Sequence, residues 1–184
     1  MKKLYTMLLL VISLCTASCS DWLDVSPSNQ VNGDKLFEIG DGYRNALNGI
    51  YLNLGTSSMY GQTMSWGFMD AIAQYYKTDN GSNFIPKTSA YYKSAKFQFE
   101  DSDVKTFISN IWSVSYNNIA NCNNLILNVS EASPSVFKEG EFEKNMIWGE
   151  ALALRAFMHF DLLRLFAPAT ATNPSGSYLP YRDK

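Results

Sequence analysis

The sequence predicts a mainly α-helical protein, built from long helical hairpins joined by irregular loops. Three apolar patterns support this fold class. Apolar residues recur at steps of three and four over about 34–54 and again over 108–129, which is the spacing of one helix face. Residues 141–166 are apolar around most of a helix circumference, so this helix needs neighbours on several sides.

The chain begins with a segment typical of an export signal. Two lysines precede an apolar run over 4–14 that is too short to span a bilayer, and small residues follow it. The small residues end at Cys19, as in the lipobox of bacterial lipoproteins, although Thr16 stands where leucine is usual. We predict that 1–18 is a lipoprotein signal peptide and that Cys19 carries acyl chains such as palmitate. The alternative is a secretory peptide that is cut elsewhere.

A tether and a first helix follow the signal. Residues 20–33 are polar and turn-rich, so we predict that 19–33 is an acylated tether to a folded region over 34–184. The first helix is expected over about 34–54, although three glycines weaken it. A loop is expected over 55–62.

The middle of the chain has weaker patterns. Residues 63–76 are expected to form a second helix, and the polar stretch 77–86, which contains glycine and proline, a loop. Aromatic and polar residues alternate over 96–100, which predicts a short strand.

The last third of the chain carries the clearest helical signal. The segment Asp-Ser-Asp at 101–103 offers an N-cap with acidic charge at the positive end of a helix, whose apolar stripe runs over 108–129. Ser-Pro at 133–134 and Gly140 break the chain before the helix over 141–166. Two long helices with a short connection form an antiparallel hairpin.

Particular side chains of the hairpin suggest how its arms meet. Glu150 and Arg155 lie on the otherwise apolar final helix, where an unpaired buried charge is costly, so we expect them to lock the hairpin. Trp112 and Tyr116 are expected in the core of the first arm. Their position opposite small residues such as Ala153 resembles a tetratricopeptide (TPR) repeat, although one such pair cannot bury both of its faces.

Charge and cysteine content exclude several classes of protein. Removal of 1–18 takes away two lysines and leaves 166 residues with 13 basic against 17 acidic side chains, a net charge near −4. Such a chain has no electrostatic reason to bind nucleic acid or an anionic membrane face, so we expect membrane contact through the lipid anchor only. Cys122 would be the one free thiol, which excludes an intramolecular disulfide and suggests a small buried hydrophobe.

Four segments of the chain, in order, carry the motifs of one protein family. They are Cys-Ser-Asp-Trp-Leu-Asp-Val-Ser-Pro at 19–27, the first-helix residues 43–51, the Ile-Trp…Tyr…Ile…Cys-Asn pattern at 111–123, and 150–168 with Leu-Pro-Tyr at 179–181. Together they resemble the RagB/SusD family of outer-membrane nutrient-binding lipoproteins of Bacteroidetes.

The resemblance implies a mostly helical lipoprotein on the cell surface, which captures a glycan or a peptide for import by a partner TonB-dependent transporter. It implies that Asp21 and Asp24 act as the acidic export signal behind Cys19, where the alternative is plain linker acidity. Members of the family continue beyond the Leu-Pro-Tyr segment, so we expect this chain to be the N-terminal part of a larger helical fold.

The sequence offers no motif for catalysis, metal or cofactor binding. His159 is the only histidine, and its place in the middle of a helix is more typical of a structural role. A glycosidase requires two paired carboxylates, and nothing pairs Asp70, Asp79, Glu100 or Asp101, which we expect in loops and caps. We therefore predict that the protein is not an enzyme and has no cofactor.

Sugar binding requires exposed aromatic faces beside planar polar groups. The stretch from Trp66 to Phe84 supplies both, and the resemblance implies that it lies near the ligand face. We take Trp66, Tyr75, Asn83 and Phe84 as candidate ligand contacts, with burial in the core as the alternative for Trp66 and Tyr76.

Two other functions stay open at this level. One is a TPR-like docking lipoprotein without a nutrient ligand, which a flat polar surface at 75–84 would favour. The other is a surface glycoside hydrolase, which turnover of a glycan would favour.

Overall fold

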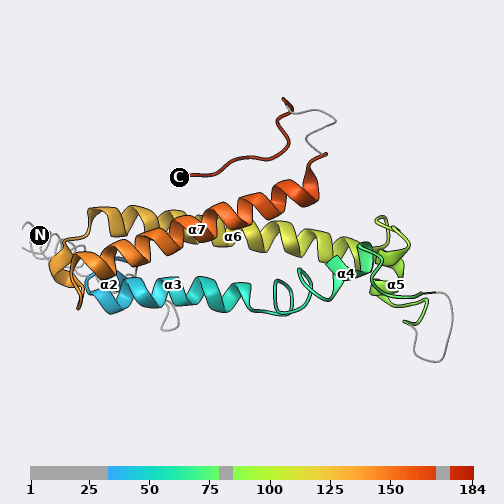
Figure 1. Cartoon of the computed structure of the whole chain (residues 1–184), viewed down its shortest axis with the longest axis horizontal. Coiled ribbons are helices and arrows are strands. Elements are labelled where there is room, and N and C mark those ends of the chain that lie inside the picture. The colour runs from blue at the N-terminus through green and yellow to red at the C-terminus, as the bar shows by residue number, and fades with distance from the viewer. Residues whose placement is uncertain (1–32, 79–84, 169–174) are drawn as a thin grey trace, which may run out of the picture. The chain divides into compact units, whose positions relative to one another are not determined.

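A computed structural model describes residues 33–78, 85–168 and 175–184. The chain divides into two units, Met1–Leu36 and Phe37–Lys184, and only one short helix of the first unit is described. The predicted helical class is confirmed, since the described ranges contain helices and no strand (Figure 1). The elements are α2 (Gly33–Leu36), α3 (Gly40–Leu54), α4 (Phe68–Ile72), α5 (Ala90–Ala95), α6 (Ser102–Glu131), the 3-10 turn η1 (Pro134–Val136) and α7 (Glu141–Phe166).

The second unit is organised around the hairpin of α6 and α7, which lie side by side as predicted (Figure 1). The side chain of Asp101 caps α6 by accepting a hydrogen bond from the backbone amide of Asp103 at 3.0 Å. Gly140 precedes α7 with a φ of 59°, a left-handed conformation that glycine adopts without steric cost. The helix α6 begins inside the predicted capping segment 101–103, and α7 begins at the predicted residue 141.

The helix α3 packs against both arms of the hairpin, and the three helices enclose the main core. Burial of these apolar side chains is the main source of stability. Among the buried residues are Leu47 and Ile50 from α3, Ile111, Ile119 and Leu125 from α6, and Ile147, Ala151, Met158 and Leu162 from α7. Cys122 is fully buried among them, as predicted, and this burial raises the pKa of its thiol to about 11.

Polar side chains connect the same three helices. Arg155 Nη1 donates a hydrogen bond to Asn123 Oδ1 at 2.9 Å, which joins α7 to α6 as predicted for this residue. Glu150 contacts α3 instead of α6, because α7 packs against two helices. Its carboxylate accepts hydrogen bonds from Arg44 at 3.4 Å and from the hydroxyl of Tyr51 at 3.1 Å.

The predicted helix over 34–54 is interrupted before Gly40. A Cβ on Gly40 would lie 2.7 Å from the carbonyl oxygen of Val136, so only glycine permits this close approach. The contact lets the start of α3 pack on the turn after α6, where the rings of Tyr43 and Phe137 lie 5.0 Å apart. Gly40, which lowers the helix propensity of this stretch, therefore permits a close contact with a residue far away in the sequence.

The predicted helix over 63–76 is wrong except for the five residues of α4. Residues 55–67 form successive wide turns between α3 and α4 (Figure 1). A Cβ on Gly67 would lie 2.8 Å from the carbonyl oxygen of Gln62, so the chain folds back closely on itself. These turns bury the side chain of Met59 completely.

The predicted strand over 96–100 is also wrong. The helix α5 ends just before this stretch, and its first turn is capped by Ser89 Oγ, which accepts a hydrogen bond from the amide of Tyr91 at 3.3 Å. Turns follow α5, and the described part of the chain contains no strand with which 96–100 could pair.

The aromatic pair expected in the core of the hairpin is only partly buried. Trp112 lies edge-to-face with Phe166 at 5.0 Å between ring centroids, which joins the two arms near the end of α7. The hydroxyl of Tyr116 donates a hydrogen bond to the carbonyl oxygen of Pro180 at 3.0 Å. Both residues pack against the core with one side and reach the surface with the other.

Candidate functional site

The end of α4 sets the position of Tyr75, one of the predicted ligand contacts. Gln74 has a φ of 63°, and its amide bonds to the carbonyl of Ala71 at 3.2 Å. The amide of Tyr75 bonds to the carbonyl of Asp70 at 3.0 Å. These two bonds form a Schellman motif, in which glycine usually holds the left-handed position. The motif turns the chain sharply and leaves Tyr75 77% exposed.

The chain before α4 presents a second predicted contact. Trp66 is 57% exposed, which excludes the core position considered for it. The hydroxyl of half-buried Tyr76 donates a hydrogen bond to the backbone carbonyl of Trp66, so the segments on either side of α4 are joined. The other two predicted contacts, Asn83 and Phe84, lie outside the described residues.

The end of α5 repeats the geometry of α4. Phe97 has a φ of 56°, and its amide donates a hydrogen bond to the carbonyl of Ser94 at 2.9 Å. The amide of Gln98 donates to the carbonyl of Lys93 at 3.0 Å. This second Schellman motif carries phenylalanine in the left-handed position, which is rare for a bulky side chain. Phe97 is 55% exposed and Phe99 is 42% exposed, with their rings 5.9 Å apart.

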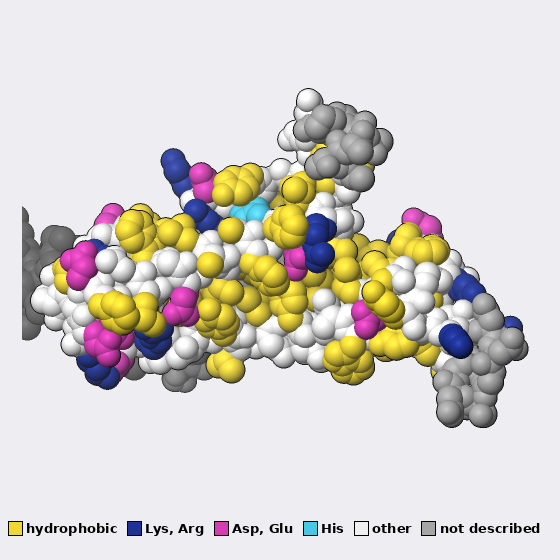
Figure 2. All heavy atoms as spheres, in the orientation of Figure 1, with side chains coloured by type: hydrophobic (Ala, Val, Ile, Leu, Met, Phe, Trp, Pro, Cys, Tyr) yellow, Lys and Arg dark blue, Asp and Glu magenta, His cyan; other side chains and the backbone are white. Residues whose placement is uncertain are grey.

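The side chain of Gln74 holds the two helix ends together. Its Nε2 donates hydrogen bonds to the carbonyl of Ala95 at 2.7 Å and to that of Ala71 at 3.2 Å. Figure 2 shows hydrophobic side chains gathered on the surface at this end of the second unit and along α7. We call the exposed ring set of this end the aromatic surface; it consists of Trp66, Tyr75, Phe97 and Phe99.

The sequence identified two members of the aromatic surface and missed the other two. Phe97 and Phe99 lay within the stretch 96–100, whose alternation was interpreted as a strand. A signal was present, since two large apolar side chains two residues apart also suit an exposed turn that displays both. No sequence rule assigns phenylalanine to a left-handed helix end, so the motif itself could not be foreseen.

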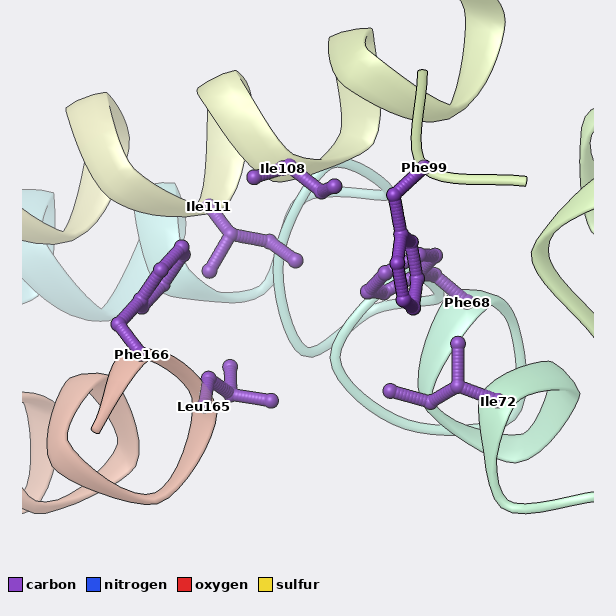
Figure 3. A pocket seen from close by; sticks show the side chains of 7 residues that line it. All are labelled: Phe68, Ile72, Phe99, Ile108, Ile111, Leu165 and Phe166. Carbon is purple, nitrogen blue, oxygen red and sulfur yellow. The ribbon is translucent and has the colours of Figure 1, made fainter. Parts of the chain in front are cut away.

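An apolar hollow of about 300 Å³ borders the aromatic surface. Figure 3 shows its side chains converging from α4, the segment after α5, α6 and the end of α7. The lining is Phe68, Ile72, Phe99, Ile108, Ile111, Leu165 and Phe166. It has no side chain that could orient a sugar hydroxyl, so a sugar would contact the exposed rings outside this hollow.

Comparison with protein families decides the class of the chain. A SusD-like family model, described as "Starch-binding associating with outer membrane", matches residues 21–182. The chain belongs to the SusD-like family. No curated protein and no solved structure matches the chain significantly. SusD-like proteins are generally non-catalytic binding proteins, and the family description associates them with the outer membrane.

In this SusD-like chain, both ring nitrogens of His159 have structural partners. Nδ1 lies 2.9 Å from the carbonyl oxygen of Arg155, one turn earlier on α7, and therefore carries the proton. Nε2 accepts a hydrogen bond from the amide of Arg182 at 3.2 Å. The side chain is buried, and its two hydrogen bonds link α7 to the C-terminal segment.

Two of the carboxylates that the sequence left unpaired, Glu100 and Asp101, have cationic partners. Glu100 pairs with Lys105 at 2.6 Å, and this contact lowers the pKa of the Glu100 carboxyl. Lys93 pairs with Asp101 at 2.9 Å, and its hydrogen bond lowers the pKa of Asp101. Asp79 lies outside the described residues.

Searches for other functional features cover the described residues only. These ranges contain no group of three or more His, Cys, Asp or Glu side chains that could hold a metal ion. None of the helices in the described part of the SusD-like chain has the length and apolarity needed to span a bilayer.

Proposed function

We propose that this SusD-like chain is a non-catalytic outer-membrane lipoprotein that captures a glycan, or a peptide, for import by a partner TonB-dependent transporter. The observation that carries the proposal is the aromatic surface, whose four exposed rings lie in the turns that flank two short, rigidly ended helices. Pyranose C–H faces stack on such rings, and fixed rings lose little freedom when a ligand binds.

The aromatic surface also favours ligand capture over protein docking. A docking lipoprotein without a nutrient ligand was expected to present a flat polar surface near residue 75. Tyr75 instead is one of the most exposed aromatic side chains among the described residues. A group of rings is costly to expose to water unless it has a use, so its exposure supports a ligand with apolar faces.

The proposal includes the anchor, which lies outside the described residues. Cleavage after residue 18 leaves Cys19 as the acylated N-terminus, and 19–33 forms the tether that holds the folded region at the outer face of the cell. We expect mass spectrometry of the native protein to find acyl chains on Cys19. A soluble periplasmic pool with an unmodified residue 19 contradicts the anchor.

Native electrophoresis in gels containing amylopectin tests the ligand site. We expect the chain to be retarded and Tyr75→Ala to lose about two- to tenfold in affinity, the range for one aromatic stacking contact. Phe142→Ala is the matched control, because Phe142 is also a largely exposed ring, 64% against 77% for Tyr75, and lies at the start of α7, away from the aromatic surface. Undiminished retardation of Tyr75→Ala, or equal losses in both variants, contradicts the assignment.

A reducing-sugar assay on the same glycan distinguishes capture from hydrolysis. We expect no release of sugar by the purified chain, and release that scales with protein concentration would contradict the non-catalytic proposal.

A further inference from the structure

The C-terminal segment 175–184 is held on the hairpin in an unusual way. It is irregular and runs back along α7 (Figure 1). Four hydrogen bonds join α6 and α7 to residues 180–183 of this described segment, and each of them reaches a main-chain atom of the segment. Tyr116 and Asn123 donate to the carbonyls of residues 180 and 182 at 3.0 and 3.3 Å.

The second arm supplies the other two bonds. Arg155 Nη1 donates to the carbonyl of Asp183 at 3.1 Å, and His159 Nε2 accepts from the amide of Arg182 at 3.2 Å. A ring contact is added, since the Tyr181 ring lies 4.5 Å from that of His159. The hairpin thus contacts the segment as a β-strand neighbour would, through amide and carbonyl groups that every peptide has.

The helical side chains are oriented by bonds among themselves. Asn123 Oδ1 accepts from Arg155 at 2.9 Å, and His159 Nδ1 donates to the carbonyl of Arg155. These bonds do not involve the segment, so Asn123, Arg155 and His159 keep their positions when it leaves, and the ring of Tyr116 is packed against Trp112 at 4.9 Å between ring centroids. A site arranged in this way is preorganised for an extended chain.

The segment does not fill the space around it. A hollow of about 480 Å³ lies between the segment and α6, lined by Trp112, Tyr116, Asn123 and neighbouring residues of the segment. Another of about 370 Å³ lies on the α7 side, where Phe160 and Leu163 contribute to the lining. Tyr181 stays mostly exposed despite its ring contact. Loose packing of this kind suits an occupant that can be exchanged.

We propose that Tyr116, Asn123, Arg155 and His159 form a binding site for an extended peptide, which they recognise through its main chain. Residues 179–183 occupy this site as an exchangeable internal segment. Leu179 packs against the core and Tyr181 lies on His159, so the site favours a peptide with an apolar residue two positions before an aromatic one. The site is separate from the aromatic surface and does not depend on glycan capture.

A fluorescent peptide of residues 177–184 tests the exchange on the full chain. We expect weak binding to the unmodified chain, and at least about tenfold tighter binding to a Leu179→Asp, Tyr181→Ala variant, whose own segment competes less. Tyr116→Phe, which removes one donor and keeps the ring, is expected to weaken binding to that variant about threefold or more. Tyr51→Phe on α3 is the matched control without effect. Absence of peptide binding to the loosened variant overturns the proposal.

Two modified peptides test recognition of the main chain and need no protein variant. N-methylation at Arg182 removes the amide that His159 accepts, and we expect it to weaken binding about tenfold. Arg182→Ala changes only a side chain, and we expect affinity within about threefold of the parent. Equal affinity of the N-methylated peptide, or an equal loss with Arg182→Ala, overturns the proposal even if the loosened variant fails to fold.

Discussion

Removal of the Tyr60 hydroxyl tests how the coiled segment after α3 is held on the hairpin. Tyr60 Oη donates a hydrogen bond to Asp161 Oδ2 at 2.6 Å, and Asp161 is only 4% exposed. Arg164 bonds to the other carboxylate oxygen through Nε at 3.0 Å and Nη2 at 2.6 Å. In Tyr60→Phe the ring can remain against Phe157, 5.1 Å away, while the buried carboxylate loses one of these donors.

The expected cost follows from the burial of the acceptor. A hydrogen bond to a charged group contributes about 1.5–3 kcal/mol, and its loss is not repaid by water when the group is buried. Arg164 is half exposed and stays in place, so we expect a loss of about 2 kcal/mol in the free energy of unfolding. If the free energy of unfolding falls by about 2 kcal/mol per molar urea, the urea concentration at the unfolding midpoint falls by about 1 M.

The pH dependence of this contribution has a defined sign. Burial, and then the hydrogen bond to Asp161, raise the pKa of the Tyr60 hydroxyl in the folded chain. Stability from this group is therefore fully present below the pKa of an unfolded tyrosine, about 10, and is lost as the pH rises above it. The difference between parent and Tyr60→Phe should be constant near neutral pH and shrink in alkaline solution.

Urea unfolding followed by circular dichroism measures the loss, and Tyr51→Phe is the matched control. Tyr51 also donates to a carboxylate, that of Glu150 at 3.1 Å, but this contact is exposed and its removal should cost less than about 0.5 kcal/mol. Equal losses in the two variants, or a loss below about 0.5 kcal/mol for Tyr60→Phe, would refute the argument from burial.

Three further predictions concern the helices. Gly40→Ala places a Cβ 2.7 Å from a backbone oxygen and should destabilise the chain by about 1–3 kcal/mol in urea unfolding. Gly49→Ala, with open space around its Cβ, should stabilise the chain by about 0.5–1 kcal/mol. A change of the same sign in both variants would disprove the close-contact argument. In a chain lacking residues 1–19, the raised pKa of Cys122, about 11, leaves roughly a thousandth of the thiol ionised at about pH 8. Iodoacetamide should therefore alkylate Cys122 only after denaturant unfolds the chain. Rapid modification of the folded chain would contradict the burial of this thiol. Arg155→Leu should lower the folding yield and leave glycan affinity per folded molecule unchanged, while equal stability with lost binding would reject its role between the helices.

The hairpin could be predicted from the sequence because its signals are local. The cap at Asp101, the break around Pro134 and Gly140, and the apolar spacing of both helices act within a few residues of one another. Over helices as long as α6 and α7, these preferences add up and outweigh single irregularities. The burial of Cys122 could be predicted in the same way, because this residue lies on the apolar stripe of its helix.

The region of the candidate site could not be predicted in the same way, because its conformation depends on contacts between distant residues. The side chain of Gln74 at the end of α4 donates a hydrogen bond to the carbonyl of Ala95 at the end of α5, and no local pattern predicts a contact between residues so far apart in the sequence. Aromatic and polar residues do alternate over 96–100, but this stretch forms turns because the described part of the chain has no strand with which it could pair. Trp66 and Tyr75 were candidate contacts because sugar binding requires exposed rings and because the resemblance implied that this stretch lies near the ligand face, while burial in the core was the alternative for Trp66.

The two left-handed helix ends support the proposal that the exposed rings form a ligand site. Gln74 and Phe97 each occupy a conformation that costs a residue with a Cβ about 1–2 kcal/mol. Such strain persists only where surrounding contacts fix it, and here each end is fixed by its Schellman bonds while the Gln74 side chain joins α4 to α5. Glycine at either position would remove the strain but would also give up the joining amide or an exposed ring. The chain retains both side chains despite this cost in stability, which supports the proposed rigid display of Tyr75 and Phe97 to a ligand.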